Sequence, residues 1–164
     1  MSAQKVIARQ GQVAFFSYTQ VENIKAENNQ VLSIIDLENN NIAVSMLMNA
    51  FIFEKALMRE HFNESYVESD IYPKATFEGT IQSYEPSGEE TQTRMIHGTF
   101  TMHGKSRNLE IKTKIQKVDN NLVLTGDFMM TVADYSINIP PLLAGNIADN
   151  VTVDFRFQFE PYEE

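Results

Sequence analysis

The chain has 164 residues, which is the usual size of one domain and is enough to bury a hydrophobic core without disulfides or bound metal. Its 22 Asp and Glu outnumber its 13 Lys and Arg, and the formal charge of -9 disfavours nucleic acid and anionic membrane surfaces as partners. Because cysteine is absent, disulfides, thiolate catalysis and cysteine-ligated zinc are excluded.

The N-terminal sequence is compatible with two cellular locations. No apolar run approaches the ~20 residues of a membrane-spanning helix, and no cationic and apolar leader opens the chain. Small residues nevertheless precede the first apolar segment, as they do around a signal-peptidase cleavage site. We therefore expect a periplasmic or secreted protein if Met1, Ser2 and Ala3 mark a removed signal peptide, and a cytoplasmic protein otherwise.

Apolar and polar residues alternate with a period of two along most of the chain, which is typical of β-strands with one dry face. The first three predicted strands span residues 13–18, 31–37 and 42–48. Asn tolerates the left-handed backbone of tight turns, so we predict turns at Asn28 and Asn29 and at residues 39–41.

One segment departs from the strand period and predicts a short amphipathic helix over residues 53–62. Its polar residues would face water, and its apolar residues recur at helical spacing: Phe53, Ala56, Leu57 and Met58.

Five further strands follow, at residues 74–84, 96–103, 109–116, 122–130 and 151–159, with polar turn residues between most of them. Eight strands joined mainly by short turns predict an all-β fold, an antiparallel up-and-down, lipocalin-like β-barrel with one short helix. Residues 138–150 predict an unusually apolar loop. We expect the helix and this loop to lie at the two ends of the barrel, one as a plug and the other as a mouth.

Catalytic patterns are absent from the sequence. His97 and His103 lie on the polar face of one predicted strand, about 20 Å apart, which is too far to share a zinc ion. His61 has Glu60 and Glu64 nearby but no second histidine at ligand spacing. No nucleophile elbow, phosphate loop or dinucleotide motif occurs. We interpret the histidines as surface or capping groups and predict neither catalysis, nor a metal, nor a cofactor other than a bound lipid.

Three glycines face the predicted barrel interior, each with a phenylalanine two residues away on the same face: Gly79 with Phe77, Gly98 with Phe100, and Gly126 with Phe128. One interpretation is that these glycines let the sheet bend and are covered by the rings. The alternative, compatible with the first, is that the missing side chains leave a channel lined by aromatic rings and adaptable methionines.

An eight-stranded barrel is either filled by its own side chains or holds one small ligand. We predict an apolar tunnel, lined by residues of the strands, the helix and the loop: Phe53, Leu57, Phe62, Phe77, Gly79, Ile81, Ile96, Gly98, Phe100, Met102, Ile111, Phe128, Met130, Ile137, Leu142, Leu143, Phe155 and Phe157.

Four segments in order resemble motifs of the YceI-like family. Residues 60–77, with His61, Phe62, Tyr66, Tyr72 and Pro73, resemble its helix-to-strand signature, and residues 98–104 resemble its strand-and-turn motif. Residues 128–137 and 150–153 resemble its last two conserved segments, although Ser136 stands where the family has glycine and residues 37–49 lack its usual strand sequence. The resemblance implies one YceI-like domain over residues 1–164, a lipocalin-like barrel with a tunnel for polyisoprenoids or other long-chain lipids or amides, and export to the periplasm.

Three hypotheses follow. The leading one is binding and carriage of a long-chain apolar ligand (a polyisoprenoid, an isoprenoid quinone-like molecule or a fatty acid or amide), by a monomer or a homodimer. The second is a filled barrel that acts through its acidic surface as a stress or protein-interaction factor. The third is an enzyme that uses His61 with Glu60 or Glu64.

Overall fold

The computed structural model describes residues 4–18, 23–137 and 149–162, and most of these residues lie in β-strands. The strands are β1 (Lys5–Tyr18), β2 (Asn23–Asp36), β3 (Asn41–Leu47), β4 (Ile52–Phe53), β5 (Lys74–Ile81), β6 (Gln92–Met102), β7 (Lys105–Val118), β8 (Asn121–Thr131) and β9 (Asn150–Pro161). The helical elements are the 3-10 turn η1 (Met48–Ala50), the helix α1 (Ala56–His61), the π-helical turn η2 (Phe62–Tyr66) and the 3-10 turn η3 (Val132–Tyr135).

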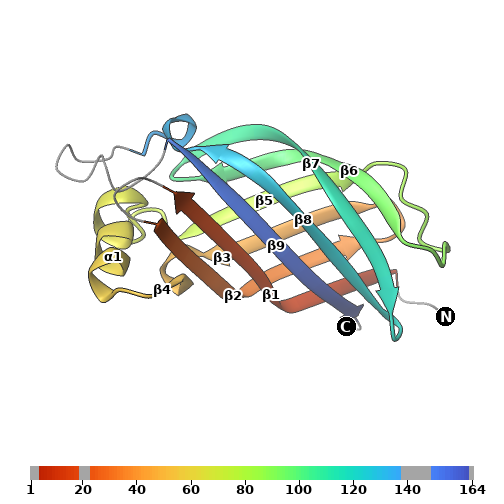
Figure 1. Cartoon of the computed structure of the whole chain (residues 1–164). Coiled ribbons are helices and arrows are strands. Elements are labelled where there is room, and N and C mark those ends of the chain that lie inside the picture. The colour runs from red at the N-terminus through yellow and green to blue at the C-terminus, as the bar shows by residue number, and fades with distance from the viewer. Residues whose placement is uncertain (1–3, 19–22, 138–148, 163–164) are drawn as a thin grey trace.

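The strands form one closed antiparallel barrel (Figure 1). Neighbours pair in the order β1-β2-β3-β5-β6-β7-β8-β9, and β9 pairs with β1 to complete the circle. The two-residue strand β4 pairs with β2 at Ala26 and Glu27, beyond the part of β2 that pairs with β3. The predicted all-β, up-and-down barrel of eight strands with one short helix is therefore confirmed.

The two ends of the barrel differ in what covers them. The helix end carries α1, η2, the turn between β6 and β7, and η3, whereas both chain termini lie at the opposite end, the termini end (Figure 1). The connection from β8 to β9 leaves and returns at the helix end, since the Val132 N–H donates to the Asp149 carbonyl over 2.9 Å. The expected loop over residues 138–150 lies mostly outside the described residues, but its described flanks, η3 and the start of β9, lie at the same end as α1, whereas we expected opposite ends.

Side chains fill the barrel interior at the termini end. Large buried residues meet there and belong to the hydrophobic core: Val6, Ile35, Ile81, Tyr84, Ile115, Leu122 and Phe159. Burying each such aliphatic or aromatic side chain contributes about 1.5–3 kcal/mol relative to leaving it exposed. This end therefore holds the part of the hydrophobic core that is filled by side chains.

Glycines on the barrel wall lie directly beneath phenylalanine rings. Gly79 and Gly98 face each other across β5 and β6, and a Cβ added at Gly98 would lie 2.5 Å from Phe77 Cζ. A Cβ at Gly126 would lie 2.6 Å from the Cζ of Phe155, which is its partner across β8 and β9. Each ring thus occupies the space of a missing side chain and lies against the wall, as in the first interpretation of these glycines.

The nearest rings to these glycines differ in part from those expected. Phe77 covers Gly79, as predicted, but it also covers Gly98, and neither Phe100 nor Phe128 is the nearest ring to its predicted glycine. Phe155 lies directly opposite Gly126, whereas Phe77 reaches Gly98 along the diagonal of the β5–β6 pair.

The predicted turn at Asn28 and Asn29 is wrong, because both residues lie inside β2. The Asn28 side chain is 0% exposed; its Nδ2 donates to the Leu47 carbonyl and its Oδ1 accepts from the Gln30 N–H, each over 3.0 Å. The amide thereby satisfies backbone groups where the β1–β2 register shifts. From the sequence alone, an asparagine that is buried and bonded to backbone groups cannot be distinguished from an asparagine in a turn.

Strand β1 begins at Lys5, well before the predicted start at residue 13. Val6, Ile7 and Ala8 are all buried in succession, so the period of two is missing at the start of this strand. Register shifts on both sides of Gly11 interrupt the alternation again further along the strand.

The helical segment is divided differently from the prediction. Helix α1 covers Ala56–His61, and the π-helical turn η2 continues it, with the Val67 N–H donating to the Phe62 carbonyl over 2.9 Å. The inward face belongs to Phe62, Tyr66 and Val67, which are buried, whereas Leu57 is 64% exposed. Leu57 was expected on the inward face, and the structure corrects this because the apolar face of the segment lies in η2.

Candidate ligand-binding site

An apolar cavity occupies the barrel interior between the filled termini end and the helix end. The space that can hold the centre of a water-sized sphere measures about 140 Å³, and the whole atom-free space, its open mouth included, measures about 1260 Å³. The surface that the described wall exposes to this space is entirely apolar; Ser17 and Tyr66 belong to the wall, but their oxygens are not exposed to the cavity. Such a concave apolar space is typical of small-molecule sites.

Twelve of the residues predicted from the sequence lie in the cavity wall: Phe53, Phe62, Phe77, Ile96, Phe100, Met102, Ile111, Phe128, Met130, Ile137, Phe155 and Phe157. The barrel closure brings them together from β4, η2, five of the long strands and the segment after η3.

The other predicted residues do not lie in this wall. Leu57 faces solvent on α1, and Ile81 belongs to the filled termini end. Gly79 and Gly98 lie behind the ring of Phe77. Leu142 and Leu143 lie outside the described residues.

The described wall also contains residues outside the predicted set: Val13, Phe15, Ser17, Ile24, Ile42, Val44, Met46, Met48, Phe51, Met58, Tyr66, Val67, Ala75, Leu124, Val132, Val151 and Val153. Of these, Met46 and Met48 are among the methionines that favour a channel in the sequence, and the others were missed. The period-two pattern could have found those on the strands, since Ile42, Val44 and Met46 alternate with polar or small residues on β3. No local pattern marks Phe51, Tyr66 or Val67, because the fold of residues 48–73 over the barrel end decides their direction.

Four phenylalanines gather at the mouth and form what we term the mouth cluster: Phe15, Phe51, Phe53 and Phe62. The ring of Phe62 lies 5.4 Å from that of Phe15, 5.7 Å from that of Phe51 and 5.0 Å from that of Phe53, measured between centroids. Phe15 comes from β1, and the other three come from β4, η2 and the residue between η1 and β4. Aromatic pairs at such distances add about 0.5–1.5 kcal/mol each to the gain from burial, so the cluster holds the helical segment against the barrel rim.

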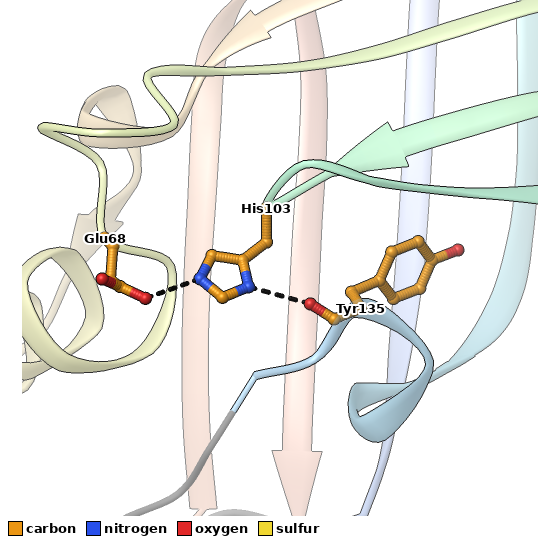
Figure 2. A network of polar contacts seen from close by, with 3 residues as sticks. All are labelled: Glu68, His103 and Tyr135. Carbon is orange, nitrogen blue, oxygen red and sulfur yellow. Dashed lines mark hydrogen bonds and ion pairs between the residues drawn. The ribbon is translucent and has the colours of Figure 1, made fainter.

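A buried histidine links the connections at the helix end (Figure 2). His103 Nε2 lies 2.8 Å from Glu68 Oε1, and Nδ1 lies 2.8 Å from the Tyr135 carbonyl oxygen. The side chain of His103 is 9% exposed, and the Tyr72 ring packs edge-on with its centroid 4.7 Å away. The expected place of His103 on the polar face of a strand is wrong, because the residue lies in the β6–β7 turn with a φ of 55°. Of the two expected roles, surface or capping, its contact with the carbonyl of the last η3 residue matches capping.

We call this set of contacts the His103 network. The Tyr135 carbonyl can only accept, so Nδ1 donates to it. The network ties η3 and the segment after η2 to the β6–β7 turn.

The remaining histidines lie apart from the cavity. His97 is half-exposed with Nδ1 3.4 Å from Glu110 Oε1, as expected for a surface group, and His61 ends α1 outside the wall. No group of three or more His, Asp or Glu among the described residues is arranged to hold a metal ion. The helices of the described ranges are too short or too polar to traverse a bilayer.

An eight-stranded barrel with one filled end and an apolar cavity at the other defines the class of small β-barrels built around an internal pocket. The family model for the YceI-like domain matches residues 5–159, and the chain belongs to this family.

Solved structures share this fold at low sequence identity. A polyisoprenoid binding domain from Saccharophagus degradans implicated in plant cell wall breakdown has a TM-score of 0.82 at 14% identity, covering 98% of this chain and 100% of that one. BcnA of Burkholderia cenocepacia has a TM-score of 0.76 at 13% identity, covering 92% and 96%. The Campylobacter jejuni YceI protein has a TM-score of 0.67 at 16% identity, covering 90% of each chain. No curated protein matches the sequence.

Proposed function

We propose that this chain binds a long-chain apolar ligand in the barrel cavity and carries it without chemical change. The observation that carries the proposal is the cavity itself, whose described wall exposes only apolar surface. The similarity to a structure described as a polyisoprenoid binding domain supports the same function. The ligand classes that fit are a polyisoprenoid, an isoprenoid quinone-like molecule and a fatty acid or amide.

The physical basis is the poor match between this wall and water. A buried water molecule needs two to four polar partners, and a hydrocarbon wall supplies none. Each methylene of a ligand that leaves water for the cavity gains about 0.8 kcal/mol. Flexible methionines from several strands contribute to the wall and can adapt to chains of different shape: Met46, Met102 and Met130.

Neither alternative function has comparable support. A factor that acts through its surface alone would need no internal cavity, whereas this barrel is filled only at the termini end. An enzyme based on His61 would need Glu60 or Glu64 beside a substrate site, and both carboxylates are exposed and outside the cavity wall.

Organic extraction of the purified protein followed by mass spectrometry tests the proposal. The matched variants are Val44→Phe, which adds a ring to the cavity wall, and Ala43→Phe, which adds the same ring on the exposed face of β3. We expect a long-chain ligand in extracts of the original chain and of Ala43→Phe, and about tenfold less in Val44→Phe, equivalent to ~1.4 kcal/mol.

Thermal unfolding of both variants shows whether a loss of ligand reflects a loss of fold. An empty extract from the original chain, combined with no uptake of added long-chain ligand, would contradict the proposal. Equal ligand recovery from the two variants would place the ligand outside the cavity.

A further inference from the structure

Two neighbouring strands of the barrel, β7 and β8, pair along only part of their length. Their pairing ends at Thr113 and Gly126, and residues 105–112 of β7 do not pair with residues 127–131 of β8, all of which the structure describes. On their other sides both strands pair to their ends at the helix end, β7 with β6 and β8 with β9. The two strands therefore part from each other on the way to the helix end (Figure 1).

Described elements border this unpaired stretch on every side, and we term it the side window. Its long edges are residues 108–112 of β7 and 127–131 of β8, and the last β7–β8 pair closes the end nearer the filled core. At the helix end η3 follows β8 and reaches back to β7, where Arg107 Nε donates to the Asp134 carbonyl over 3.1 Å. The side window thus exists without the breaking of any strand pair.

A glycine stands at the corner where the two strands part. A Cβ added at Gly126 would lie 2.9 Å from the Lys112 carbonyl oxygen, which is closer than Cβ atoms normally come. Glycine inside a strand often marks such a close approach or a bend. Strand β8 can therefore turn away from β7 directly after Gly126.

The inner edges of the side window belong to the cavity wall. Ile111 of β7 and Phe128 and Met130 of β8 all line the cavity. Apolar surface continues outwards, because Leu109 is half-buried without bordering the cavity and Met129 is 66% exposed. A hydrocarbon chain that crosses the window therefore meets apolar side chains from the outside of the barrel to the cavity.

We propose that the side window is the portal through which the hydrocarbon chain of a ligand enters and leaves the cavity. This inference rests on the proposed carrier function and adds the route that the ligand takes. A chain that passed beneath α1 at the helix end would have to separate the packed rings of the mouth cluster and the two pairs between β2 and β4. At the side window only side chains of the inner edge have to move, above all the half-buried Phe128 ring.

A crosslink across the side window tests the inference, because the chain contains no cysteine and engineered cysteines are its only thiols. The variant Glu110→Cys with Met129→Cys places a pair on the outer faces of the two strands, where continued β7–β8 register would set them opposite each other. Bis(maleimido)ethane then bridges the window. We expect bridging to slow uptake and release of the dye N-phenyl-1-naphthylamine about tenfold in stopped-flow fluorescence, with little change in affinity because the cavity is untouched.

Two further bridged pairs are matched controls. Lys114→Cys with Thr125→Cys joins register partners in the paired part of β7 and β8, and Glu27→Cys with Ile52→Cys joins β2 to β4 at the helix end. These four residues do not belong to the cavity wall. We expect bridging of either pair to leave both rates unchanged.

The outcomes separate the route from the function on which it rests. Rates that bridging at the side window leaves unchanged would overturn the portal and leave the carrier function standing. Equal or greater slowing by the β2–β4 bridge would place the entry at the helix end, and equal slowing by the bridge in the paired part would show that the window has no special role. No binding of the dye or of an added long-chain ligand by the original chain would overturn the carrier function itself.

Removing the ring at the inner edge is an independent test in the opposite direction. Phe128→Ala widens the side window and should raise the rate of dye uptake about threefold, because fewer atoms have to move aside. Thermal unfolding of the variant shows that it is folded at the temperature of the measurement. Uptake by the folded variant that is no faster than uptake by the original chain would contradict the portal.

Discussion

The two ends of this barrel are built from the same kind of strand but differ in what their inward side chains do. At the termini end Ile35, Ile81 and Phe159 are almost completely buried and fill the interior. Towards the helix end the rings of Phe77 and Phe155 lie over glycines on the wall, and the cavity remains between them. The comparison teaches that a ring contributes to a filled core or to the wall of a cavity according to what lies beneath it.

Truncating one ring at each end of the barrel tests most directly whether the two ends differ in packing. Phe159→Ala removes a fully buried ring from the filled end and should lower the free energy of unfolding by about 3–5 kcal/mol. Phe128→Ala removes a half-buried ring that already borders empty space, and should cost only about 1–2 kcal/mol. Urea unfolding of the two variants measures both costs, and equal costs would mean that the ends do not differ in packing.

Adding a methyl group beneath a ring tests whether that ring lies against the wall at the cavity. Gly98→Ala should destabilise the protein by about 3 kcal/mol, because the new Cβ would meet the backbone oxygen of Glu78, which is the nearest atom, and Phe77 Cζ at 2.5 Å. The displaced ring should also enter the cavity and weaken binding of n-tridecane. Combining Gly98→Ala with Phe77→Leu should recover part of that binding, as a double-mutant cycle would measure. If the effects of Gly98→Ala and Phe77→Leu on binding were strictly additive, the Phe77 ring would not contact the position of Gly98.

Removing the His103 network tests how the helix end is held together, with a smaller expected effect. His103→Ala leaves the Glu68 carboxylate and the Tyr135 carbonyl without their shared partner and should cost about 2 kcal/mol. Hydrogen exchange should increase in η2 and η3 and stay unchanged at the termini end. The matched control His97→Ala, on the exposed face of β6, should stay within about 0.5 kcal/mol of the original protein. Loss of protection throughout the barrel would show that the network stabilises more than the helix end.

The sequence by itself determined the barrel and much of its inner face. Strand residues alternate between two faces, so a local pattern such as that of Ile96, Phe100 and Met102 indicates which side chains turn inward. The turns were equally local, since Asn40 and Asn120 adopt the positive φ values of 61° and 69° that asparagine tolerates. These features depend on neighbours in the chain and can be read without knowing the fold.

Only the tertiary structure decided which end is filled, where the hidden polar groups lie and which of them have partners. Asn28 and His103 are polar in sequence but buried, because their partners come from Leu47, Glu68 and Tyr135, distant in the chain. The Tyr66 hydroxyl is buried without a partner among the described residues because residues 48–73 fold across the barrel end. Burial and hydrogen bonding are properties of surroundings assembled from separate strands, and the period of a single strand carries no information about them.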